Sequence, residues 1–544
     1  MYDHIKISDS CPKDMLNSNF YYGIPIITPR DSVSFQVRKE VETFVRSKCT
    51  PGIYRDPEYI NSIIKDVFSF LENKITPLVK KLSCVDLIKF LLGEYSKSCA
   101  VQEYYSRGYA FPDREQWRQR NGFRRSIKYL VEKMLECLEE SKQVPMDVLP
   151  TDFEYLIELT EIAFDFSIQS ATTYGISRER TIYELYGECP NPYKQYYDLR
   201  IADYNHEDFE NAHLLFRHFV GKNGSLHQDI IEEYKSSIKG CSDKSCQYLR
   251  DFFEIFHVLM HLDYDCNDVF IPKNEFKTKL ATKYNIPIDS IDLFVEINSI
   301  NKEGLKKNPR FIYGTKQEYR LKKRFIMEFE SKGTPYLLYT LEMLNESYRM
   351  LHKALCYNDL PVQLNSEKLK NISANITRSY GKKFEAYAND FLKTKGFVGS
   401  TSKRKLPSGI IIPGDVGEID FLGYSKEQKK LVCFEFKNVF YSTDSLEHRD
   451  DLEKFVRKKD SYLNKFKKKI DFVKAHIGEL TNYYRQNDSV DLSEAQLIIG
   501  ILTYAPNISR FFMTDCKCMS LAEFEAEWAK NPEQFFVDVL AQRI

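Results

Sequence analysis

The chain has 544 residues, which at roughly 150 residues per domain is enough for two to four domains. Its 43% hydrophobic and 29% charged residues are typical of a globular protein and exclude a largely disordered or fibrous chain. The 78 Lys and Arg balance the 78 Asp and Glu, so any binding of nucleic acid must depend on a local basic patch.

No apolar run approaches the roughly 18 to 20 residues that cross a bilayer, so we expect a soluble protein with no membrane partner. The 13 cysteines are scattered, and Cys84, Cys137 and Cys356 lie inside apolar helical patterns. Because an odd number of cysteines cannot all pair within one chain, we expect free thiols and a reducing, cytoplasmic compartment.

Residues 1 to about 370 are expected to be mainly helical, because apolar residues recur there at helical spacing. A break rich in Gly, Pro and Asn at 186–193 predicts an internal boundary, and it divides this part into regions 1–190 and 191–370. A further helical pattern runs from Tyr336 to Leu355 and ends in turn-forming residues, so a second boundary is expected near residue 370.

After residue 370 the pattern changes to short β-rich runs between helices. We expect, in chain order, a helix at 376–395, strands at 409–412, 417–424 and 430–439, a long basic amphipathic helix from about Leu446 to Ile477, a strand at 496–504, and a closing strand and helix from 516. This order predicts a multidomain protein whose C-terminal part, 371–544, is an α/β domain with a mixed central sheet.

Two of the expected strands carry carboxylates among apolar neighbours. In GEIDFLGY, alternation puts Glu418 and Asp420 on one face, and in LVCFEFKNV it puts Glu435 and Lys437 together. If these strands pair, Asp420 and Glu435 converge, and a hard divalent cation would compensate for burying both carboxylates. Such a cation activates water and neutralises charge on a phosphoryl group, which favours a phosphodiesterase.

The order of these residues resembles that in the PD-(D/E)xK nuclease superfamily, especially its restriction-endonuclease-like and nuclease-related (NERD) branches. The segment GKKFEAYANDFL carries Glu385 on a helix and is followed by GEID and then by FEFKN. The resemblance implies that Glu385, Asp420 and Glu435 bind Mg²⁺ or Mn²⁺, and that Lys437 completes the catalytic set by orienting or activating the attacking water. Helical spacing places Glu385 on the same face as the apolar Ala388, so we expect it to point inward.

The resemblance further implies a metal-dependent endonuclease that acts on nucleic acid, with DNA the favoured substrate, in microbial restriction or anti-phage defence. The N-terminal region is then expected to target or restrain the nuclease, through its own contacts, a homo-oligomer or a regulatory partner. Two alternatives stay open. One is a nuclease of DNA repair or processing, and the other is a non-catalytic nucleic-acid-binding or assembly protein with a degenerate nuclease fold.

A run of basic residues from Lys454 to Lys469 lies within the expected long helix. Its apolar residues keep helical spacing toward the core, so the opposite face is positive and is expected to contact phosphates. A solvated helix face with no binding role is the alternative. The residues assigned to nucleic-acid binding are Lys458, Lys459, Lys465, Lys467 and Lys468.

A weaker signal is the order Cys241, Cys246, His257 and His261, which imitates a zinc finger. Four residues separate the two cysteines, and no β-hairpin pattern precedes the histidines, so the spacing does not fit a zinc finger. We therefore expect satisfied histidines in the core or at its boundary on a helix.

Overall fold

A computed structural model of the chain describes residues 18–106, 114–139, 149–188, 196–262, 268–308, 319–364, 366–439, 442, 445–492, 496–530 and 541–543. Among the helices in these ranges, none combines the length and the apolar composition that a membrane span requires.

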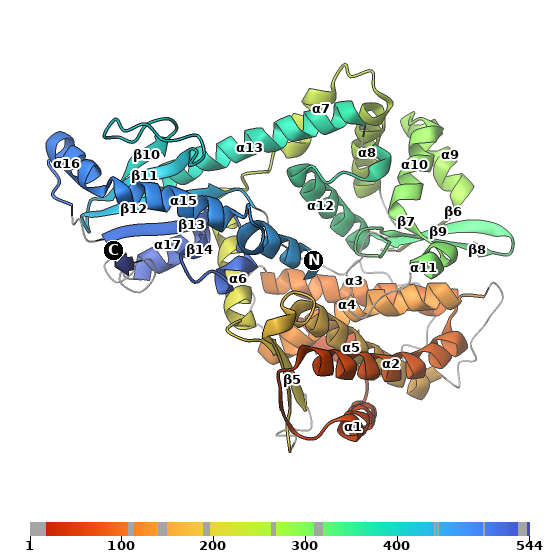
Figure 1. Ribbon diagram of the computed structural model, residues 1–544. Helices are drawn as coiled ribbons and strands as arrows, with labels where there is room; N and C mark the ends of the chain where they lie inside the picture. Colours follow the sequence, from red (N-terminus) through yellow and green to blue (C-terminus); the bar gives the residue numbers. More distant parts are fainter. Residues whose placement is uncertain are drawn as a thin grey trace. The chain divides into compact units, whose positions relative to one another are not determined.

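The chain forms two compact units that alternate along the sequence (Figure 1). The helical unit comprises Met1–Ala202, Ile238–Ala354 and Asp359–Leu369. The α/β unit comprises Asp203–Ser237, Leu355–Asn358 and Lys370–Ile544. The α/β unit therefore does not begin at residue 370, because it also includes the earlier segment Asp203–Ser237.

The prediction of a mainly helical N-terminal half is confirmed. In α2, Pro57 starts the helix, the Asp56 side chain accepts a hydrogen bond from the Glu58 N–H, and buried residues such as Ile60 and Ile64 form the apolar stripe. The helices are α1 (Asp31–Lys48), α2 (Pro57–Leu82), α3 (Val85–Ser106), α4 (Arg114–Cys137), α5 (Leu149–Thr173), α8 (Lys244–His261), α9 (Lys273–Tyr284), α10 (Ile288–Asn298), α11 (Lys302–Lys307) and α12 (Leu341–Tyr357).

This unit also contains small sheets that the helical periodicity did not predict. Their orders are β1-β2, β3-β4-β5 and β6-β9-β8-β7. The strands are β1 (Ser18–Tyr21), β2 (Ile24–Ile27), β3 (Gly52–Tyr54), β4 (Thr181–Leu185), β5 (Tyr197–Ile201), β6 (Asp268–Pro272), β7 (Ser299–Ile300), β8 (Ile326–Ser331) and β9 (Thr334–Thr340). The boundary expected at 186–193 falls in the connection between β4 and β5, which pair with each other.

The helical pattern expected from Tyr336 begins instead with a strand. Lys332 and Gly333 both have positive φ, 52° and 74°, as a two-residue hairpin turn requires, and they join β8 to β9. The helix α12 starts only at Leu341, where the Thr340 side chain accepts a hydrogen bond from the Met343 N–H at 3.2 Å.

The α/β unit contains a mixed sheet of order β10-β11-β12-β13-β14, and β15 pairs with β13. β10, β11 and β12 are antiparallel, whereas β12, β13 and β14 are parallel. The prediction of a C-terminal α/β part with a mixed sheet is thus confirmed. The strands are β10 (Phe397–Ser402), β11 (Ile419–Ser425), β12 (Lys430–Lys437), β13 (Gln496–Thr503), β14 (Lys517–Ser520) and β15 (Ala541–Arg543).

Helices cover both faces of this sheet. On one face, Phe434 and Phe436 pack with side chains of α6, α13 and α17, and on the other, Leu422 and Cys433 pack with α15 and α16. This division follows the alternation of side chains along each strand. The helices are α6 (His206–Asn223), α7 (Ile230–Ile238), α13 (Glu367–Thr394), α14 (Ser445–Leu452), α15 (Tyr462–Ala475), α16 (Ile477–Asp488) and α17 (Leu521–Lys530).

Two predicted elements of this unit are wrong. Residues 409–412 form no strand, and only an isolated bridge joins Lys405 to Ile411. The single long helix from Leu446 to Ile477 is instead α14, a π-helical turn at Glu453–Arg457 and then α15. The reason for the break is local, because Ser461 caps α15 by accepting a hydrogen bond from the Asn464 N–H.

Candidate functional site

Two carboxylates meet at the ends of β11 and β12. Phe421 pairs with Phe434 in this antiparallel ladder, so Asp420 lies next to Glu435 one residue further along both strands. Asp420 is two residues from Leu422, and Glu435 is two residues from Cys433, so both carboxylates point to the sheet face that α15 covers. Asp420 and Glu435 are buried, with 8% and 4% of their surface exposed.

Lys437 joins the two carboxylates. Its Nζ donates to Glu435 Oε1 at 2.7 Å and to the Phe436 carbonyl oxygen at 2.8 Å, and it lies 3.5 Å from Asp420 Oδ2. The backbone N–H of Phe436 donates to the same Asp420 oxygen at 2.7 Å. The Tyr462 ring, whose centroid is 5.2 Å from Nζ, lies beside this ammonium. Lys437 is thus in contact with both of the other sequence-predicted residues, Asp420 and Glu435.

A second ammonium, that of Lys469, completes the group. Lys469 lies on α15 and donates from Nζ to Glu435 Oε2 at 2.6 Å, and only 7% of the residue is exposed. From the sequence, Lys469 is only the last residue of the basic run, and no role of its own is assigned to it. Its spacing from Phe466 and Val473, both buried, places it on the inward stripe of the helix, and this signal could have identified it.

The electrostatics reflect how close these charges are. Burial, together with the negative charge of Glu435, raises the pKa of Asp420 to about 6. Burial opposes the charge on Lys437, but Glu435 and Asp420 outweigh that effect and raise its pKa. Lys437 therefore remains an ammonium at neutral pH, and Asp420 is the carboxyl whose ionisation is costly.

Glu385 lies near this group without a direct side-chain contact to it among the described residues. It is half-buried on α13, and burial and the charge of Glu418 raise its pKa, with a smaller effect from Glu435. Its helix packs on the other sheet face, through Phe384 and Ala388. The structure therefore places Glu385 at the margin of the site.

Among the described residues, two carboxylates of this group, those of Asp420 and Glu435, are in contact with Lys437. Within the described ranges, no three His, Cys, Asp or Glu side chains are grouped so that they could hold a metal ion. Asp420 and Glu435 nevertheless fit a hard cation, because carboxylate oxygens are the ligands that such an ion prefers. The raised pKa of Asp420 shows that its ionised form is unfavourable here, and a nearby cation would stabilise that form. Among the described residues, the hydrogen bonds to the Asp420 side chain all go to Oδ2.

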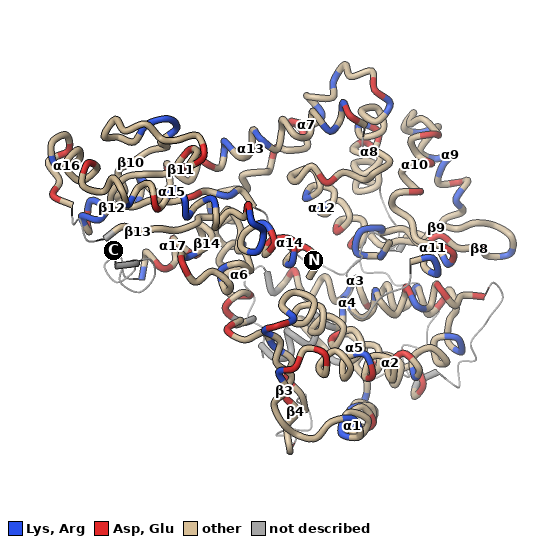
Figure 2. Tube along the Cα trace, viewed as in Figure 1, with Lys and Arg blue, Asp and Glu red and all other residues tan. Residues whose placement is uncertain are grey.

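The five lysines assigned to nucleic acid differ in their surroundings. Lys458 and Lys459 are exposed in the break before α15, where Figure 2 shows Lys and Arg recurring along the chain. Lys465 and Lys468 are exposed on α15, and Lys465 is 3.7 Å from Asp460. Lys467 is half-buried and forms an ion pair with Asp515 at 2.5 Å. The exposed lysines remain candidates for phosphate contacts, whereas Lys467 already has a structural partner.

The four residues with a zinc-finger-like order do not form a metal site. Cys241 and Cys246 are joined by a disulfide, so neither offers a thiolate to zinc. His257 and His261 lie one turn apart on α8, and the His261 ring bonds to the His257 carbonyl oxygen at 2.8 Å. Both are exposed, so the expectation of core or boundary histidines is wrong. The disulfide also differs from the expectation of free thiols, although eight other described cysteines are free.

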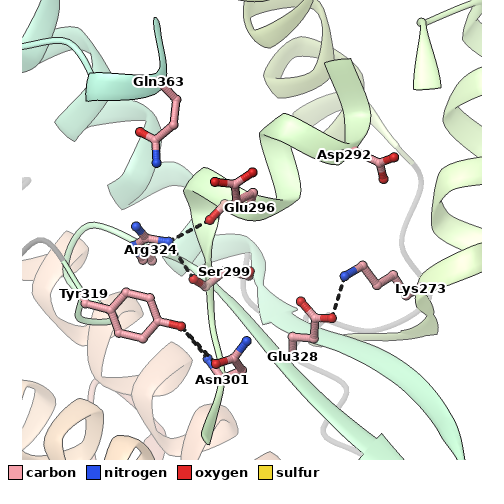
Figure 3. A pocket seen from close by; sticks show the side chains of 9 residues that line it. All are labelled: Lys273, Asp292, Glu296, Ser299, Asn301, Tyr319, Arg324, Glu328 and Gln363. Carbon is pink, nitrogen blue, oxygen red and sulfur yellow. Dashed lines mark hydrogen bonds and ion pairs between the residues drawn. The ribbon is translucent and has the colours of Figure 1, made fainter. Parts of the chain in front are cut away.

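A separate polar pocket of about 520 Å³ lies in the helical unit (Figure 3). Arg324 donates there to the carbonyl oxygens of Glu296 and Ser299, at the end of α10, and Lys273 pairs with Glu328 at 2.5 Å. These contacts hold the ends of secondary-structure elements together. Its lining residues are Lys273, Asp292, Glu296, Ser299, Asn301, Tyr319, Arg324, Glu328 and Gln363.

Compared with models of protein families, with curated proteins and with solved structures, the chain matches none of them. Any functional assignment therefore depends on the residues and on their geometry.

Proposed function

We propose that the α/β unit is a divalent-metal-dependent endonuclease that cleaves phosphodiester bonds in nucleic acid, with DNA the favoured substrate. The observation that carries this proposal is the contact of Asp420, Glu435 and Lys437 at the ends of two paired strands. Buried carboxylates and an ammonium on adjacent core strands have little value for stability, because desolvation offsets much of their attraction. Their chemistry suits a phosphoryl substrate.

In this proposal, Asp420 and Glu435 would hold Mg²⁺ or Mn²⁺, and Glu385 at the margin would add a third carboxylate to the site. When bound, the ion supplies an activated water and neutralises the charge that develops on the phosphoryl group. Lys437 keeps Glu435 oriented through its 2.7 Å contact and holds an ammonium beside the attacking water. The exposed lysines of α15 supply attraction for the phosphate backbone.

A second candidate is the non-catalytic protein with a degenerate nuclease fold. The observation that favours it is that Asp420, Glu435, Lys437 and Lys469 neutralise one another without a metal ion. In that case the four groups would be a structural ion network, and the α15 surface would bind nucleic acid without cutting it.

Cleavage assays separate the two candidates. The full chain is incubated with supercoiled DNA, linear DNA and RNA, each with Mg²⁺, Mn²⁺, Ca²⁺ or EDTA. We expect cutting with Mg²⁺ or Mn²⁺, little turnover with Ca²⁺, which is larger and a weaker Lewis acid, and none with EDTA.

The site variants are Asp420→Asn, Glu435→Gln and Lys437→Met. Each is expected to lower the cleavage rate by orders of magnitude, because each removes a group from the metal or water position. Each variant should stay folded, because the new side chain is close in size to the one that it replaces. The matched controls are Asp415→Asn and Glu427→Gln, two exposed acids in the same part of the chain, which should cut like the wild type. Full activity in a folded Asp420→Asn protein would exclude the proposed site.

A further inference from the structure

Lys469 differs from every other lysine of its basic run because its ammonium is buried. The side chain is 9% exposed, and that of its partner Glu435 is 6% exposed. Lys469 lies on the same buried stripe of the helix as Phe466 and Val473, which belong to the core against the sheet. Burying an unpaired ammonium costs free energy, so Lys469 depends on its ion pair with Glu435 to occupy this position.

The charges of the four groups in direct contact sum to zero. Asp420 and Glu435 contribute two negative charges, and Lys437 and Lys469 contribute two positive ones. Both oxygens of Glu435 are engaged, one by each lysine. A divalent cation that entered this buried group with all four residues in place would leave an excess of two positive charges, which a poorly solvated site opposes.

We propose that Lys469 is an internal competitor for the divalent cation and keeps the metal site closed in the absence of substrate. This inference rests on the proposed function, since it takes Asp420 and Glu435 as the metal ligands. The ammonium of Lys469 and the metal ion draw on the same Glu435 carboxylate, and they repel each other at short range. Metal binding therefore requires Lys469 to give up Glu435 Oε2.

This competition has a consequence for regulation. A phosphodiester brings negative charge to the site and offsets the excess that the cation creates, so nucleic acid and metal ion should each strengthen the binding of the other. The released Lys469 ammonium then has a phosphate oxygen as its natural partner. The site is thereby loaded with metal chiefly when substrate is present.

The test measures Mn²⁺ binding to the full chain without nucleic acid, by titration calorimetry and by the rise in melting temperature on adding Mn²⁺. Lys469→Met removes the ammonium with little change in shape, and Lys469→Gln keeps a donor for Glu435 but loses the charge. Lys474→Met, on the same helix, is the matched control. We expect both Lys469 variants to bind Mn²⁺ about tenfold more tightly or better than the wild type, and the control to match the wild type.

The outcomes separate this inference from the proposed function. Melting in EDTA first establishes that each variant is folded. If folded Lys469→Met and Lys469→Gln bind Mn²⁺ no more tightly than a wild type that does bind and cut, Lys469 is not a competitor and the inference fails alone. If wild type and variants bind no Mn²⁺, with or without DNA, the metal-dependent function itself fails. Tighter binding in the Met variant but not in the Gln variant would assign the effect to the hydrogen bond and also overturn the charge argument.

Discussion

Asp420 is the residue at which stability and the proposed chemistry conflict. Its carboxyl group is buried beside Glu435, and this raises its pKa to about 6, whereas in an unfolded chain it titrates near 3.9. A carboxyl with a raised pKa in the folded state binds its proton more tightly there. The contribution of this carboxyl group to the free energy of unfolding is therefore most favourable below about pH 4. This contribution decreases as the pH rises from about 4 to about 6.

This sign gives a prediction for the metal-free protein. Asp420→Asn removes the cost of the buried charge, which for a shift of about two pKa units is on the order of 3 kcal/mol at pH 8. We expect the variant to melt at a higher temperature than the wild type at pH 8 in EDTA, and the difference to shrink toward pH 4. Saturating Mn²⁺ should raise the melting temperature of the wild type more than that of the variant.

Melting curves at pH 4.5, 6 and 8 check this prediction, with Asp415→Asn as the exposed control. An equal difference between Asp420→Asn and wild type at all three pH values would mean that the carboxyl is not strained by its surroundings. A lower melting temperature for Asp420→Asn at pH 8 would mean that its contacts with Lys437 and with the Phe436 N–H outweigh the burial cost.

At the scale of elements, α15 combines two roles on two faces. Its inward stripe carries Phe466 and Val473 and delivers Lys469 to the site, and its outer face exposes Lys465 and Lys468. Because the helix begins only after the cap at Ser461, the exposed Lys458 and Lys459 lie in the preceding turn and do not continue this face. The exposed lysines of the basic run therefore form two separate groups, one before α15 and one on its outer face.

The outer face of α15 gives a second prediction. The double change Lys465→Glu and Lys468→Glu is expected to weaken DNA binding whatever the sequence and to reduce the slope of log K against log salt by about 2, one unit for each lost phosphate contact. Lys467 is excluded from the set, because changing it would break its ion pair with Asp515. Binding is measured in Ca²⁺ between low and moderate salt.

Lys474→Glu on the same helix serves as the control for the change in net charge. If the double variant and this control show the same affinity and salt slope as the wild type, the outer face of α15 is an ordinary solvated surface. The basic run would then contribute only Lys469 to the proposed function.

At the scale of the molecule, the α/β unit depends on a segment from the first half of the chain. α6 places Phe216 and Phe219 in the core of this unit, against α13 and α17. The backbone N–H of Leu226 donates to the Tyr504 hydroxyl at 2.9 Å, and Tyr234 on α7 donates to the Leu355 carbonyl oxygen. A fragment that begins at residue 370 lacks all of these contacts.

We therefore expect residues 370–544 alone to fail to fold, and loss of activity in that fragment would not report on regulation by the helical unit. Within the intact chain, Phe219→Ala is expected to destabilise the α/β unit by about 3 to 5 kcal/mol through cavity formation. Leu215→Ala, an exposed position on the same helix, should cost less than about 1 kcal/mol. Hydrogen exchange at the amides of β12 and β13 is the measurement.

Faster exchange in these strands for Phe219→Ala, but not for Leu215→Ala, would agree with this assignment. Unchanged exchange in Phe219→Ala would show that α6 is only attached to the unit and that the C-terminal part folds without it. A fragment from residue 370 would then be the right tool for asking whether the helical unit restrains cleavage, as the proposed function expects.

The sequence by itself determined the features that depend on local patterns. Alternation along each strand was enough to predict that Glu435 and Lys437 share a face, whereas their meeting with Asp420 also required the two strands to pair. The change in periodicity near residue 370 predicted a helical part followed by a mixed sheet. Both depend on residues only two to four positions apart, where the backbone geometry of a strand or a helix decides which side chains lie together.

Tertiary structure alone decided the rest. It brought Lys469 to Glu435 across 34 residues, set Glu385 at the margin of the site, and joined α6 to a sheet whose strands begin almost two hundred positions later. The short strands of the helical unit escaped prediction for the same reason, since β4 pairs with β3 from far earlier in the chain. Such contacts depend on which apolar faces pack together in the core, and the spacing of residues along the sequence does not specify that packing.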